Sequence, residues 1–261
     1  MNLDKRNPID LNTIEKRCAE LPCYSKKRNM SIIVFGIGAS KIYSAGFTLI
    51  EMSISMLVIG AMLGGIMSAQ IVMDMNKVHL IEADFRNIPQ LINDYEDKYH
   101  AKPGDDPTIN SPNSHLPYAI PCAPLLLGMC MPGNGMIDGK WNDTSAASES
   151  FIVWQQLRLA DFMAGDSNFA SVNYVPRNVV GGALGVTSQA NTPIAGLKGS
   201  FIVCSDNIAG KYVKQIDIAL DDGSTDAGSM MATQSGTALG GAPIPTNAIV
   251  DGDIYLLCMG I

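Results

Sequence analysis

The hydrophobic positions of the chain follow two different patterns within one continuous stretch. From Met52 to Met73 there is no charged side chain, and apolar residues occupy every face of a helix. With about 1.5 Å of rise per residue, a helix of this length crosses the roughly 30 Å hydrocarbon core of a bilayer. The pattern predicts that 47–73 is the membrane-spanning half of a long helix.

After Met73 the pattern becomes amphipathic, because apolar residues recur at alternating spacings of three and four. Charged residues fill the other faces, and a cluster of turn residues begins at Lys102. We therefore predict that the helix continues over 74–101 and lays one apolar stripe against a folded domain. The stripe consists of Val78, Ile81, Phe85, Ile88, Ile92, Tyr95 and Tyr99.

The remaining part, 102–261, contains shorter periodic segments separated by turn residues. They predict an α+β fold, in which the long N-terminal helix packs on a small antiparallel sheet of three to five strands. The predicted helices run from Thr144 or Ser145 to Gly165, and over 208–220 with Asp206 as the cap. The predicted strands cover 200–204, the region around 229–233 and part of 251–258, with edge strands such as 171–175.

Charge divides the chain into two parts. Residues 1–46 carry eight Lys or Arg against four acids, whereas the remainder carries ten against twenty-one, a net charge of −11. A basic segment before an apolar helix and an acidic domain after it predict a single-pass membrane protein with a cytoplasmic N-terminus and an exported domain. An acidic exported domain is a poor candidate for nucleic-acid binding.

The six cysteines divide in the same way. Cys18 and Cys23 lie in the basic segment, and the other four lie in the exported part, where cysteine pairs oxidise. Four cysteines allow three connectivities. We favour one disulfide that closes a small Pro- and Gly-rich loop and a second that ties an inner strand to the C-terminal strand. These pairs are Cys122 with Cys130 and Cys204 with Cys258. Metal ligation is the less favoured alternative, because no CxxC pair occurs and no histidine is near.

A short motif stands at the start of the apolar stretch. Residues 46–51 read GFTLIE, and they resemble the class III signal of type IV pilins and type II secretion pseudopilins. In that family a prepilin peptidase cuts after the glycine and methylates the new N-terminus. The resemblance therefore implies a cleaved cytoplasmic leader, 1–46, and an N-methylated Phe47. The leader is longer than is usual in the family, and the sequence leaves open whether it starts at Met1 or Met30.

Three later blocks also resemble the family, and they extend the resemblance over nearly all of the mature chain. These blocks are DKYHAKPGDDP, ESFIVWQQLRLADFMAG and KYVKQIDIALDDGSTDAGSMMA. The resemblance implies a pilin-like domain over 102–261, with disulfide-tied loops, and a structural rather than enzymatic function. It also implies a bacterial inner-membrane protein that joins a periplasmic or extracellular filament. The implied partners are the prepilin peptidase, other pilin or pseudopilin subunits and an inner-membrane assembly platform.

Glu51 is the one acid in the apolar stretch, and no basic residue lies in the same segment. An unpaired carboxylate inside a membrane costs about 2.5 kcal/mol or more. Cleavage before Phe47 would create an amino cation, which could pair with the Glu51 of a neighbouring subunit. Glu51 is thus predicted to set the register of assembly; an ordinary signal anchor with an incidental acid is the alternative.

Two loops invite a metal hypothesis, since carboxylate and amide oxygens are typical calcium ligands. The candidates are Asn134 and Asp138 in the segment PGNGMIDGKW, and Asp221 and Asp222 after the third helix. Ordinary turns held by bonds from side chains to the backbone are the favoured alternative in both places. Acid–base catalysis by a pair of these carboxylates is the least favoured interpretation. The competing function is a membrane-anchored enzyme or binding domain, and the sequence contains no clear nucleophile motif that would support an enzyme.

Overall fold

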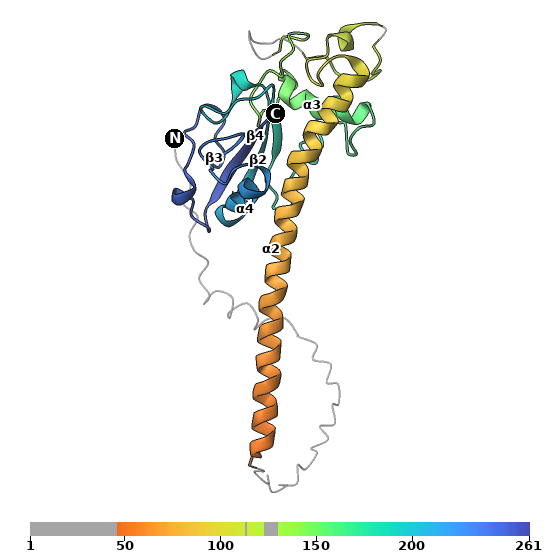
Figure 1. Ribbon diagram of the computed structural model, residues 1–261. Helices are drawn as coiled ribbons and strands as arrows, with labels where there is room; N and C mark the ends of the chain where they lie inside the picture. Colours follow the sequence, from red (N-terminus) through yellow and green to blue (C-terminus); the bar gives the residue numbers. More distant parts are fainter. Residues whose placement is uncertain (1–45, 113, 123–129) are drawn as a thin grey trace, which may run out of the picture. The chain divides into compact units, whose positions relative to one another are not determined.

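The computed structural model describes residues 46–112, 114–122 and 130–261 (Figure 1). The predicted leader up to residue 45, with Cys18, Cys23 and Met30, lies outside the described residues. The chain divides into two compact units, Met1–Ser53 and Ile54–Ile261. All the strands belong to the second unit, which is an α+β domain.

The long N-terminal helix, α2, spans Leu49–Tyr99 and continues through Pro89. Its apolar stripe is the predicted one, since Ile81, Ile92 and Tyr95 are fully buried, whereas Tyr99 is only partly buried. Ile81, Ile92 and Tyr95 belong to one core cluster with residues of the sheet, including Val203 and Leu257. The predicted stripe is therefore buried as expected, and α2 ends at Tyr99, two residues before the predicted end at residue 101.

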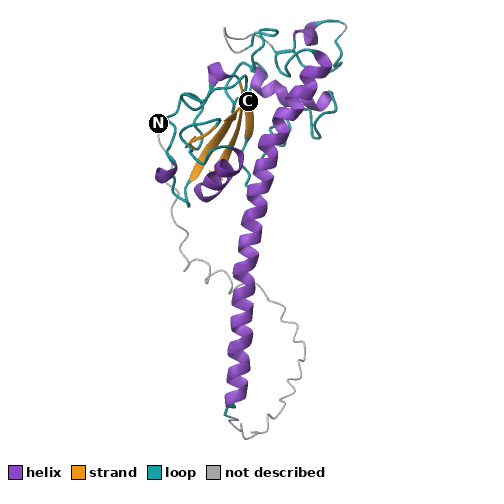
Figure 2. Ribbon diagram, viewed as in Figure 1, coloured by secondary structure: helices purple, strands orange, loops and turns teal. Residues whose placement is uncertain are grey.

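The sheet has four antiparallel strands in the order β1-β2-β4-β3. Figure 2 shows the strands of this sheet in orange. Their bounds are β1 Leu184–Thr187, β2 Ile202–Ala209, β3 Met230–Gln234 and β4 Ile254–Gly260. The last strand, β4, therefore pairs with both β2 and β3 in the middle of the sheet. Four strands lie within the predicted number.

Both faces of the sheet are buried. Alternating residues of β2 divide between two clusters: Val203 faces the large core shared with α2, and Ile202 and Cys204 face a smaller one. The smaller core also contains Trp141, which comes from the loop before helix α3, Glu149–Leu159. The sequence predicted only the helix-covered face, since the loops that cover the second face carry few apolar residues.

Two shorter helices complete the fold, α3 at Glu149–Leu159 and α4 at Gly210–Leu220. Both predicted starts were wrong, and the predicted end of the first of these helices was also wrong, because α3 ends at Leu159 and not at Gly165. Ser148, and neither Thr144 nor Ser145, precedes α3 as its N-cap. The third helix begins at Gly210 because β2 continues to Ala209 through a bulge, where Asn207 has a φ of 60°. Asp206 lies in that bulge and accepts hydrogen bonds from Ser235 and Gly236.

One strand prediction was also wrong. Residues 171–175 form turns, and the edge strand is β1, at Leu184–Thr187. Four buried residues form β1, but two of its neighbours in sequence, Gly181 and Gly182, give the segment the appearance of a loop. Gly185 is required there because a Cβ atom at this position would lie 2.0 Å from the carbonyl oxygen of Trp141.

Candidate assembly helix and buried acid clusters

The first half of α2 exposes large apolar side chains on all its faces. Among the described residues, α2 is the one helix that is long and apolar enough to cross a membrane. The most hydrophobic stretch of this helix has no residue buried within the protein. The exposed apolar residues of this half include Leu49, Ile50, Met56, Leu57, Leu63, Ile66, Ile71 and Met75, and the exposed Phe47 lies just before it. A surface of this size requires a partner, which can be lipid or other apolar helices.

The start of α2 is capped by a residue of the signal-like motif. The backbone N–H of Glu51 donates to the carbonyl oxygen of Thr48 at 3.1 Å and lies 3.3 Å from its Oγ1. The spacing Thr-x-x-Glu is that of a capping box, in which the acid also favours the positive end of the helix dipole. Glu51 therefore has a local role that the sequence analysis missed, although the spacing was visible in GFTLIE.

Three glycines give the exposed half of α2 space for a close neighbour. A Cβ atom added at Gly60, Gly64 or Gly65 would meet nothing within 4 Å. Small residues of this kind let helix backbones approach one another in lipid. The glycines are thus compatible with helix–helix packing, at the cost of some intrinsic helix stability.

The loop that contains Asn134 and Asp138 is held together by carboxylates. Asp105 accepts backbone N–H bonds from Gly133 at 2.5 Å, from Asn134 at 3.0 Å and from Gly135 at 2.7 Å. Asn134 Nδ2 donates to Asp138 Oδ2 at 2.8 Å. Burial raises the pKa of Asp105, and its three backbone donors oppose that shift. These bonds from side chains to the backbone are those expected of an ordinary turn, the alternative favoured over calcium binding. The sequence did not single out Asp105, which accepts most of them.

The second group of acids follows α4. Asp221 Oδ2 accepts the N–H of Met230 at 2.9 Å, and Asp222 Oδ1 accepts that of Ser224 at 2.9 Å. Asp217, in the last turn of the helix, is fully buried, and within the described residues its carboxylate oxygens have no hydrogen bond of good geometry; the backbone N–H of Gly223 gives only a weak interaction that opposes the effect of burial. Burial, with smaller contributions from the neighbouring acids Asp221 and Asp222, raises the pKa of Asp217 to about 6.

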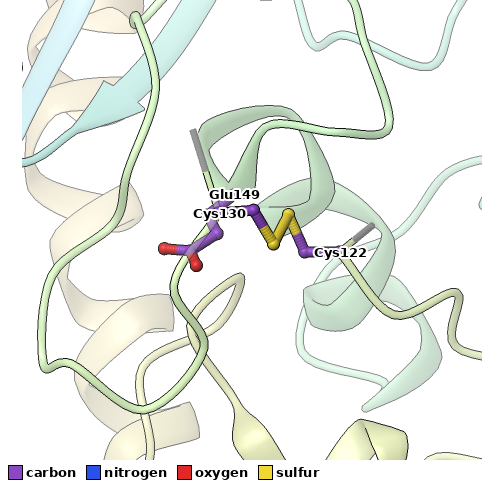
Figure 3. Close-up of side chains that lie close together, drawn as sticks. All are labelled: Cys122, Cys130 and Glu149. Carbon is purple, nitrogen blue, oxygen red and sulfur yellow. A yellow bond between two sulfur atoms is a disulfide. The ribbon is translucent and has the colours of Figure 1, made fainter. Parts of the chain in front are cut away.

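The structure joins the four described cysteines in the favoured pairs, Cys122 with Cys130 and Cys204 with Cys258. Cys204 and Cys258 stand opposite one another in β2 and β4, so this disulfide ties an inner strand to the C-terminal strand. In the described part of the chain, one set of three or more His, Cys, Asp or Glu residues has its ligand atoms within 4.8 Å of one another. The set is Cys122, Cys130 and Glu149 (Figure 3). The four predicted calcium ligands form no such set there, and calcium binding stays a hypothesis.

Glu149 is the acid of this set, and its side chain is fully buried. Its carboxylate accepts the N–H of Met131 at 2.7 Å and that of Asp138 at 2.9 Å. Burial raises the pKa of Glu149 to about 8, and the nearby acids Asp105 and Asp138 add to the shift. The sequence indicated only an acid in the first turn of a helix.

One constellation has the residue types of a catalytic triad. His115 Nε2 lies 3.0 Å from Asp106 Oδ2, and its Nδ1 lies 2.9 Å from Thr108 Oγ1. However, Asp106 Oδ1 also accepts the Thr108 N–H at 2.8 Å and the Thr108 hydroxyl at 2.7 Å. The Thr108 hydroxyl is therefore shared between Asp106 and His115, and Asp106 serves as the N-cap of the short helix Pro107–Asn110. This geometry is that of a capped turn, with the imidazole of His115 stacked on Tyr99.

No family model, no curated protein and no solved structure matches this chain.

Proposed function

We propose that the chain is a structural subunit of a type IV pilus or a type II secretion pseudopilus. In this proposal a prepilin peptidase cuts between Gly46 and Phe47, and the mature subunit assembles through the apolar half of α2. The filament extends from the bacterial inner membrane into the periplasm or beyond the cell. Other pilin or pseudopilin subunits and an inner-membrane assembly platform are the partners.

The observation that carries the proposal is the division of α2, which begins within the GFTLIE motif, into two different halves. The second half buries one stripe in the α+β domain, whereas the first half exposes every face. A simple membrane anchor would account for the exposed half. It would not account for the GFTLIE motif at the start of the apolar stretch, which resembles a cleavage signal.

The test is the production of the full chain in cells with and without a prepilin peptidase. Removal of residues 1–46 lowers the mass by about 5 kDa, since the whole chain of 261 residues has a mass of 27.8 kDa. Mass spectrometry of the product is expected to find an N-terminal methylated Phe47 only when the peptidase is present. A Gly46→Leu variant serves as the matched control, because it alters the cleavage residue and leaves α2 unchanged.

An uncut and unmethylated chain in its native host would contradict the proposal. The chain would then be better described as an anchored exported domain. Deletion of the gene, followed by electron microscopy of the cell surface and an assay of protein secretion, distinguishes a pilus from a secretion pseudopilus.

A further inference from the structure

Lysine side chains from two separate helices gather where the apolar stretch of α2 ends. Lys211, in the first turn of α4, donates to Asp74 of α2, which is the residue directly after Met73. Lys77 lies 3.8 Å from the same carboxylate, and the side chains of Lys77 and Lys211 are both 42% exposed. A third lysine, Lys214, follows less than one turn later in α4.

The turn before β4 completes this surface. Lys214 Nζ lies 2.8 Å from Asp251 Oδ1, and the N–H of Lys211 donates to the carbonyl oxygen of Asp251. Val250, the residue before Asp251, is apolar and yet 56% exposed. We call the surface formed by Lys77, Lys211, Lys214 and Val250 the junction face.

The junction face lies at the level of lipid headgroups when the apolar half of α2 spans a bilayer. Asp74 and Lys77 stand about 2 Å and about 6 Å beyond Met73 along the helix. The headgroup layer extends roughly 5–7 Å on each side of the hydrocarbon core. The contact of Lys211 with Asp74 brings the start of α4 to the same level, and the buried stripe of α2 begins just above it, at Val78.

We propose that the junction face binds the surface of the membrane that α2 spans, and that its ligands are the headgroup phosphates of phospholipids, anionic phospholipids above all. This inference rests on the membrane position of α2 in the proposed function and is independent of cleavage and assembly. Lysines close to a membrane surface are attracted to anionic lipids. An exposed apolar side chain beside them, here Val250, can enter the boundary between headgroups and acyl chains.

The distribution of charge in the domain favours this face over the others. The net charge of 47–261 is −11, so most of its surface is repelled by an anionic membrane. The junction face contains three of the ten Lys and Arg residues of 47–261. The acids beside it, Asp74, Asp251 and Asp253, are three of twenty-one, so the face carries no net negative charge. A subunit in the membrane is then held with this face against the bilayer, and entry into a filament releases it.

The experiment uses the full chain in vesicles of three parts phosphatidylethanolamine to one part phosphatidylglycerol. Vesicles with phosphatidylcholine in place of phosphatidylglycerol are the neutral comparison. The photoreactive residue p-benzoylphenylalanine replaces Val250 in one protein, Leu63 in a second and Tyr118 in a third. After irradiation, mass spectrometry measures the fraction of each peptide that carries a lipid.

Positions 63 and 250 should form lipid adducts, and position 118 should form none. Tyr118 is 89% exposed, but its loop is held at the far end of α2, where His115 stacks on Tyr99. Tyr99 is about 37 Å beyond Asp74 along the helix. The adduct yield at position 250 should be about threefold or more higher with phosphatidylglycerol, and this excess should fall as salt is added.

Lys214→Gln should lower the yield at position 250 by about twofold or more in the anionic vesicles. Lys198→Gln is the matched control, since Lys198 is exposed and lies beside Gly260, at the other end of β4. It should leave the yield unchanged. Hydrogen exchange of the unlabelled wild type gives a measurement that the photoreactive residue does not disturb: residues 249–253 should exchange more slowly in the anionic vesicles.

Two kinds of failure have different signatures. Adducts at position 63 with none at position 250 would overturn the binding of the junction face and leave the membrane position of α2 intact. An adduct yield and an exchange rate that are the same in both kinds of vesicle would reduce the contact to mere proximity and would also overturn it. The absence of lipid at position 63 would overturn the membrane position of α2 and this inference together.

Discussion

The hydroxyl group of Tyr212 donates a hydrogen bond to Oδ1 of Asp74 over 2.6 Å. The other oxygen of Asp74 accepts a hydrogen bond from Nζ of Lys211. Asp74 lies in α2 directly after the apolar stretch, and Tyr212 lies in the first turn of α4. This contact joins the long helix to the domain at the point where its exposed apolar half ends.

Replacement of Tyr212 by Phe is expected to lower the melting temperature by about 2 °C at pH 7. Its partners, Lys211 first and Tyr212 second, hold the pKa of Asp74 below the ordinary value of 3.8. The stability from this carboxylate is therefore present above pH 3.8 and is lost as the pH falls below it. Circular dichroism melting curves of the wild type and Tyr212→Phe, recorded on the full chain in detergent, measure this effect. The difference in melting temperature between the two proteins should be smaller at pH 2.5 than at pH 7.

Tyr118→Phe is the control for this measurement, because the Tyr118 side chain is 89% exposed. It should leave the melting temperature unchanged at both pH values. An equally large loss for Tyr212→Phe at pH 7 and pH 2.5 would mean that the tyrosine acts through packing and not through the carboxylate.

Asp217 should weaken the fold at neutral pH. Its folded-state pKa is raised to about 6 from 3.8, so the folded chain binds this proton more tightly than the unfolded chain does. The resulting stability is complete below pH 3.8 and is lost as the pH rises through about 6. Asp217→Asn should therefore be more stable than the wild type by about 1–3 kcal/mol at pH 7, with a much smaller difference at pH 4.

Urea unfolding of both proteins at pH 4 and pH 7 measures this change. Asp97→Asn, which removes an exposed acid of α2, is the control and should show little dependence on pH. A wild type that is as stable as Asp217→Asn at pH 7 would contradict the raised pKa of Asp217. Millimolar calcium that stabilises the wild type and not the variant would support the calcium hypothesis for Asp221 and Asp222.

Gly185→Ala tests the second core of the sheet. The new Cβ atom would lie 2.0 Å from the carbonyl oxygen of Trp141 and 2.8 Å from its ring. Overpacking of this kind typically costs 1–3 kcal/mol, and the rigid backbone contact places the expected loss at about 3 kcal/mol. Urea unfolding checks the value, with Gly252→Ala as the control, because a Cβ atom there would meet nothing within 4 Å. An unchanged stability for Gly185→Ala would contradict the close approach of Trp141 to β1.

The sequence predicted the features that depend on long periodicity. The stripe from Val78 to Tyr99 repeats over several turns, so the position of α2 on the sheet could be inferred without the structure. The disulfide between Cys204 and Cys258 followed from the expectation that one cysteine lies in an inner strand and the other in the last strand. In both cases the tertiary contacts agree with the local sequence pattern: the apolar stripe packs on the sheet, and the two cysteines lie in paired strands.

Features that depend on a few distant contacts could not be predicted. The bulge at Asn207 extends β2 into the predicted helix, because pairing with β4 resumes at Ile208. The acids Asp105 and Glu149 look like ordinary turn and helix-cap residues in the sequence. Their burial and their bonds to the loop after Cys130 arise only when separate segments meet, as Gly133 and Asp105 do.

Two substitutions of Glu51 separate its possible roles. Gln can replace Glu in a capping box but carries no charge, whereas Val can neither take part in a capping box nor carry a charge. If Glu51 pairs with the amine of a neighbouring subunit, both Glu51→Gln and Glu51→Val should be cleaved normally and yet enter filaments at least about tenfold less than the wild type, because the amine lacks its anion in lipid. Immunoblots of sheared filaments, normalised to the processed subunit, measure the effect. Thr48→Ala is the matched control, since it removes the Oγ1 that faces the Glu51 N–H and keeps the carboxylate. Normal assembly of Glu51→Gln together with loss in Glu51→Val and Thr48→Ala would assign Glu51 to the helix cap, and charge pairing between subunits would have to be abandoned.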